Sequence, residues 1–120
     1  MKYIKNLLTL LNQLKIYHWQ TTSYAQHQAF GGAYEALDGL IDRFIEAYMG
    51  RYERIYTSNG NNVTLTLYDT EALDYTSFIK NVRNYLEELE VPNPSDTDLL
   101  NIRDEMLAEI DKLSYLLTLD

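Results

Sequence analysis

The chain has 120 residues, of which 46% are hydrophobic, and it contains no cysteine. This length and composition fit one globular domain, residues 1–120, and exclude disulfides and thiolate metal sites. No apolar run approaches the roughly 20 residues that span a bilayer, so we expect a cytoplasmic protein with no membrane partner. The net charge of −8 makes DNA binding unlikely and suits metal cations or a basic protein surface.

Apolar residues at three- and four-residue spacing predict four helices, over about residues 2–20, 24–55, 70–90 and 96–117. Several polar, glycine and proline residues mark where these helices begin and end. They are Thr21 to Ser23, Gln26 as the capping-box partner of Ser23, Gly50, Pro92 with Pro94, and Asn93 or Ser95 as the cap of the fourth helix.

Residues 57–69 lack helical periodicity and separate the second helix from the third. Ser58–Asn62 has the composition of a turn, and Val63–Leu67 alternates like an extended strand. Thirteen extended residues reach about 43 Å, close to the roughly 46 Å of the predicted second helix. The fold class is therefore all-α, a four-helix bundle with a long extended connection between helices 2 and 3.

The two histidines, His18 and His27, lie on either side of the short turn between the first two helices. That turn brings both imidazoles toward one point, as a metal site requires. Histidines at helix ends are also common as ordinary surface residues, so the pair alone leaves both interpretations open.

Four carboxylates lie along the second helix: Glu35, Asp38, Asp42 and Glu46. The last three are each four residues apart and share one helix face. A solvated acidic face is the simpler interpretation of such spacing. The apolar neighbours Ile41, Phe44 and Ile45 favour partial burial against a partner.

His27 and Asp42 are 15 residues apart, about 22 Å along a helix, and therefore cannot share one metal within a chain. Two copies of this helix, antiparallel about a two-fold axis near residues 35–36, bring His27 of one copy toward Asp42 and Glu46 of the other. Small residues that permit close approach surround this crossing: Gly31, Gly32, Ala33, Ala36 and Gly39. The spacing predicts a homodimer, or a higher homo-oligomer built from it.

Three segments, Tyr17–Trp19, His27–Phe30 and Asp42–Glu46, together resemble the ferroxidase motif of the Dps-like miniferritins, a branch of the ferritin-like superfamily. The resemblance implies a ferritin-like bundle in which His18 and His27 are metal ligands from one subunit. Asp42 and Glu46 are then the ligands from its dimer mate. It further implies iron as the metal, with zinc or manganese as competitors, and oxidation of Fe(II) by peroxide or dioxygen.

The chain departs from the family pattern in three places. Gly31 stands where the family commonly has an acid, so that Asp38 or Glu35 would have to replace this ligand. The turn between the histidines is about three residues shorter, and the connector replaces a short helix that contributes to family packing. A hollow shell therefore does not follow from the resemblance, and these features favour a diverged, phage-encoded relative.

An alternative hypothesis follows from the same departures: a ferritin-like scaffold without ferroxidase chemistry that acts as a protein-interaction module. The acidic residues that it would present to a basic partner lie in the second half of the chain. They are Glu87, Glu88, Glu90, Asp104 and Asp111.

Overall fold

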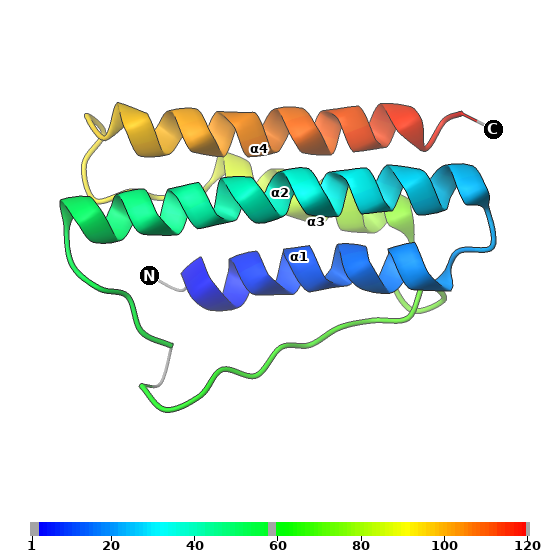
Figure 1. The fold of residues 1–120 in the computed structure, drawn as a ribbon, viewed down its shortest axis with the longest axis horizontal. Coiled ribbons are helices and arrows are strands. Elements are labelled where there is room, and N and C mark those ends of the chain that lie inside the picture. The colour runs from blue at the N-terminus through cyan, green and yellow to red at the C-terminus, as the bar shows by residue number, and fades with distance from the viewer. Residues whose placement is uncertain (1–2, 58–59, 120) are drawn as a thin grey trace.

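The computed structural model describes residues 3–57 and 60–119, and its regular structure is entirely helical (Figure 1). The helices are α1 (Tyr3–Gln20), α2 (Tyr24–Arg51), α3 (Tyr75–Glu87) and α4 (Thr97–Leu116). This confirms the predicted all-α class with four helices and a long second connection. Within these residues no helix is long and apolar enough to cross a membrane. Lys2 and Ser58, which the sequence predictions included, lie outside the described residues.

The helices meet through the apolar stripes that the periodicity predicted. The pairs α1–α2, α2–α4 and α3–α4 pack directly against each other. Tyr17, Phe30, Tyr75 and Phe78 form an aromatic cluster near the α1–α2 turn, with ring centroids 4.8 to 5.3 Å apart. Tyr52 is 38% exposed, because it lies just beyond the end of α2.

Several predicted helix boundaries differ from the structure, including the end of the third helix, which lies at Glu87 and not near residue 90. The third helix begins at Tyr75 and not near residue 70, because the carboxylate of Asp74 accepts a hydrogen bond from the Ser77 backbone N–H at 2.7 Å and caps it there. The second helix ends at Arg51, three to four residues early. The N-cap position of α4 is Asp96, in place of Asn93 or Ser95.

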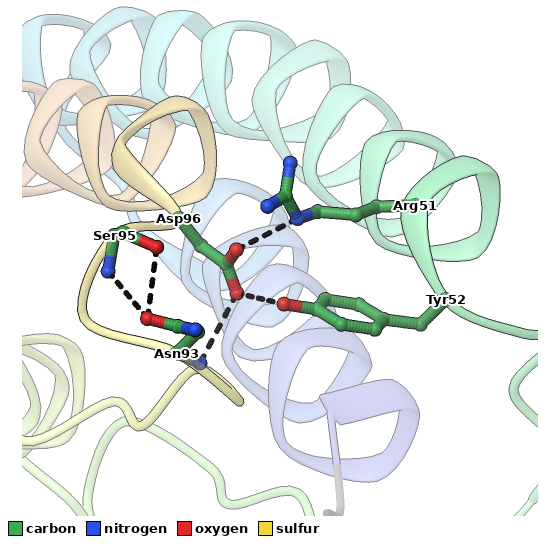
Figure 2. Close-up of polar contacts among 5 residues, drawn as sticks. All are labelled: Arg51, Tyr52, Asn93, Ser95 and Asp96. Carbon is green, nitrogen blue, oxygen red and sulfur yellow. Dashed lines mark hydrogen bonds and ion pairs between the residues drawn. The ribbon is translucent and has the colours of Figure 1, made fainter.

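Asp96 joins the end of α2 to the loop before α4 (Figure 2). Its side chain is completely buried. The carboxylate lies 2.7 Å from Arg51 Nε, and it accepts hydrogen bonds from the Tyr52 hydroxyl and, at 3.2 Å, from the Asn93 backbone N–H. The Asp96 side chain makes no helix-cap bond to α4. It acts as a clasp, meaning a side chain that holds the end of α2 against the loop before α4.

The connector runs back along α1, as its length predicted (Figure 1). Two glutamines of α1 hold its second half. The buried amide of Gln13 donates to the Tyr68 carbonyl and accepts from the Tyr68 N–H, both at 2.8 Å. Gln20 accepts from the Thr70 N–H at 2.9 Å. These bonds hold the connector against α1 up to Thr70, where residues 70–72 form a turn in place of the predicted start of the third helix.

Candidate metal centre

His18 and His27 lie face to face at the end of the bundle formed by the α1–α2 turn. Their ring centroids are 3.8 Å apart and the ring planes differ by 18°. His18 Nδ1–H donates to the His27 carbonyl at 2.8 Å, and His27 Nδ1–H donates to the His18 carbonyl at 2.9 Å. Each imidazole thus crosses to the backbone of the other helix, which fixes both rings in place.

Local sequence explains why the two helices present these rings to each other. The turn predicted at Thr21–Ser23 is confirmed, and Ser23 caps α2 by accepting from the Gln26 N–H at 3.2 Å. The reciprocal half of the predicted capping box is missing, because the Gln26 side chain accepts from the Thr21 hydroxyl at 2.6 Å. This tight turn brings the last residues of α1 beside the first turn of α2.

The hydrogen bonds define which nitrogen each histidine offers to a ligand. A carbonyl only accepts, so Nδ1 must carry the proton in both rings, and the neutral ring then presents Nε2 as a lone-pair donor. An Nδ1–H bond to a backbone carbonyl is a common way to orient a metal-ligating histidine. Nearly parallel rings do not place both in-plane lone pairs on one ion, so joint ligation requires one ring to rotate.

Gly31 lies directly against His18. A Cβ atom built on Gly31 would be 3.0 Å from His18 Cε1 and 3.2 Å from Nδ1. The residue therefore makes room for the imidazole, at the position where the related motif commonly has an acid. Any larger side chain at position 31 competes with the observed position of His18.

The carboxylates of α2 lie on an exposed face of the bundle. Glu35, Asp38, Asp42 and Glu46 are all exposed. Ion pairs to them are absent among the described residues, whereas the neighbouring Arg43 pairs with Glu105 at 3.3 Å. Asp42 and Glu46 are thus accessible to a ligand, but no group of three metal-ligating side chains forms within the described part of one chain.

Gly32 and Gly39 share this exposed face with the acids. Nothing lies within 4 Å of a Cβ built on either residue. Packing within the chain therefore does not require either glycine. Each weakens the isolated helix by about 0.5–1 kcal/mol relative to alanine.

The structure thus brings the histidines together and leaves them apart from Asp38, Asp42 and Glu46 in the single chain, as the helix spacing requires. Two residues of the Tyr17–Trp19 segment flank His18 in the sequence. Tyr17 is fully buried and donates to the Leu73 carbonyl at 2.6 Å, and burial raises its pKa. Trp19 is 66% exposed, with Lys15 Nζ 5.7 Å from its ring centroid.

The fold and these side chains define a small α-helical bundle protein with a histidine pair at the α1–α2 turn and a row of exposed carboxylates along α2. Residues 18–117 match a Family of unknown function (DUF5856), and the chain belongs to this family.

The chain is also similar to an "Uncharacterized 14.6 kDa protein in mobD-ri intergenic region" of Enterobacteria phage T4. The two are 45% identical over 40 residues, which is 33% of this chain and 31% of the phage protein. The match thus spans about a third of its relative's length. No solved structure matches the chain.

Proposed function

We propose that this protein is a ferritin-like, Dps-related protein that binds iron at a site shared between two subunits and oxidises Fe(II). The observation that carries the proposal is the cross-bonded histidine pair, in which both Nδ1 atoms bind carbonyls and both Nε2 atoms are left as ligands. Imidazole and carboxylate ligands together suit Fe(II), with zinc and manganese as competitors.

A second copy of the chain supplies the carboxylate ligands that lie too far from the histidines within one chain. In an antiparallel α2–α2 pair, His18 and His27 of one subunit approach Asp42 and Glu46 of the other. The exposed Gly32 and Gly39 lie between these ends and permit close backbone contact, which accounts for two glycines that the monomer does not need. Asp38, one turn before Asp42, is a further candidate ligand.

Iron is the substrate in this proposal. Each Fe(II) bound by the imidazoles and carboxylates gives up one electron. Two such ions, one at each site of the dimer, reduce one peroxide with two protons to two water molecules, or one dioxygen with two protons to peroxide. The carboxylates stabilise the added charge of Fe(III). The residues of this chain bind and orient the ion. The reciprocal backbone bonds leave Nε2 of each imidazole free for it, and one ring rotates when both bind the same ion.

Anaerobic Fe(II) titration of the purified protein tests the proposal. We expect about one ion per subunit, as in a mononuclear site with open positions for the oxidant. His18→Ala and Asp42→Ala should each abolish saturable binding while the helical circular dichroism is retained, because neither side chain belongs to the core. Glu53→Ala, which removes an exposed acid beyond the end of α2, is the control. Unchanged iron affinity in both site variants would refute the proposal.

The alternative, an interaction module with an acidic surface, has weaker support. Three of the five acids that it needs are already paired: Arg83 lies 3.3 Å from Glu87 and 2.8 Å from Asp111, and Arg103 lies 2.8 Å from Asp104. Loss of iron binding together with recovery of one basic partner in a pull-down would favour it.

A further inference from the structure

The connector contains an extended segment, residues 63–67, whose backbone is unpaired. No backbone hydrogen bond joins these five residues to any other described residue. The nearest such attachment is made by a side chain, where Gln13 holds both polar groups of Tyr68. An extended segment with free N–H and C=O groups is a template for pairing with another strand.

The side chains of this segment divide into two sets. Thr66 and Tyr68 line a cavity of about 260 Å³ between α1, α3 and the connector. The alternate residues Val63, Leu65 and Leu67 are outside the hydrophobic core, and Leu67 is 39% exposed. Val63 and Leu65 are half-buried and Leu67 is exposed, so these three apolar side chains are incompletely covered by the described residues.

We propose that residues 63–67 pair with the same residues of a second copy, as an antiparallel ladder centred on Leu65. The sequence Val-Thr-Leu-Thr-Leu is nearly palindromic about Leu65. In this register Leu65 faces its own counterpart, Val63 faces Leu67, and Thr64 faces Thr66. Every apolar side chain thus meets an apolar one and every threonine a threonine, which are favourable cross-strand pairs.

Two-fold symmetry supports a second copy as the partner. An isologous contact needs a surface that is complementary to itself, and an antiparallel strand with a palindromic pattern has this property. The connector runs on the outside of α1 (Figure 1), where another chain has access to it. The inference goes beyond the iron site and holds equally in a protein that binds no metal.

Cysteine cross-linking tests the pairing and its register, since the native chain has no cysteine. In the proposed ladder the Cα atoms of the two Leu65 residues are about 4.5–5.5 Å apart, within disulfide reach. We expect mild oxidation to link Leu65→Cys subunits about a hundredfold faster than Glu71→Cys subunits, which meet only by collision. Glu71 is exposed beyond the connector.

A mixed experiment checks the register. Two Thr64→Cys subunits would place their Cα atoms on a diagonal about 7–8 Å long, which is too far for a disulfide. A mixture of Thr64→Cys with Thr66→Cys should cross-link readily, whereas each variant alone should not. Equal rates for Leu65→Cys and Glu71→Cys would overturn the inference, as would efficient linking of Thr64→Cys with itself.

A charge variant supplies a second measurement. Leu65→Lys places two lysines opposite each other, and we expect it to weaken self-association at least about tenfold in sedimentation equilibrium. The melting of the helices should change little, because Leu65 is only half-buried and lies outside the core. Ser114→Lys, on exposed α4, is the control. Unaltered association in Leu65→Lys would contradict the pairing. Iron binding is measured separately, so failure of the metal site does not affect this result.

Discussion

Replacement of Asp96 by alanine should destabilise the protein far more than removal of any exposed acid. The variant loses two hydrogen bonds to a buried carboxylate, from the Tyr52 hydroxyl and the Asn93 N–H, and the ion pair with Arg51 (Figure 2). Hydrogen bonds to a charged group contribute about 1.5–3 kcal/mol each. Arg51 is half exposed and returns to water, so its pair adds little.

The lower end of this range applies, because Tyr52 is itself partly exposed and regains a bond to water. We therefore expect a loss of about 3 kcal/mol in the free energy of unfolding. With an unfolding entropy of about 0.25 kcal/mol/K for a chain of this length, the melting temperature should fall by about 12 °C.

Urea unfolding followed by circular dichroism measures the loss, and Asp98→Ala is the matched control. Asp98 is an exposed acid in the first turn of the same helix, and its removal should cost less than about 1 kcal/mol. Tyr52→Phe should lie between the two variants. Equal effects of Asp96→Ala and Asp98→Ala would refute the view of Asp96 as a clasp.

Three further predictions concern other parts of the molecule. Gly32→Ala should raise the free energy of unfolding by about 0.5–1 kcal/mol, measured by urea unfolding of dilute protein. Gly31→Ala should show no such gain, because its Cβ displaces His18. Equal gains in the two variants would contradict the contact between Gly31 and His18. Gln13→Leu should lower the free energy of unfolding by about 2 kcal/mol, because it leaves the backbone N–H and C=O of Tyr68 without their Gln13 partner. Hydrogen exchange at the Tyr68 amide should become faster. Unchanged exchange would contradict the attachment of Tyr68 to Gln13. Burial, the largest cause, raises the pKa of Tyr3 to about 12, so the folded protein keeps a proton that the unfolded chain loses above about pH 10. Stability should therefore fall as the pH rises from about 10 to 12, and Tyr3→Phe should reduce this slope in unfolding experiments.

The helices were predictable because each buries one stripe at a spacing that only a helix produces. The residues at which the helices begin and end were less predictable. The third helix was placed too early because nothing in Thr70–Leu73 forbids a helix, and the bonds from Gln20 and Asp74 that stop it depend on tertiary structure. The bonds of Asp96 to the end of α2 could not be predicted, since its partners Arg51 and Tyr52 are more than 40 residues away in the sequence.

The candidate site was predictable only in part. The short turn between His18 and His27 was enough to place the two rings together, since few backbone paths connect helices over three residues. The cross-bonding to opposite carbonyls was not predicted. Gly31 was interpreted as a missing ligand, and its contact with His18 emerged only from the geometry of packed helices. Iron binding and the dimer remain predictions.

Subunit complementation tests the shared site most directly. One variant carries His18→Ala with His27→Ala, and the other carries Asp42→Ala with Glu46→Ala; both should bind no iron as homodimers. Subunit exchange after mixing should restore binding, because each heterodimer holds one site with all four ligands and one with none. Equal mixing makes half of the dimers heterodimers, so about one quarter of the wild-type iron capacity should return. No recovery in a mixture shown to exchange subunits would contradict the shared site, as would full iron binding by either variant alone.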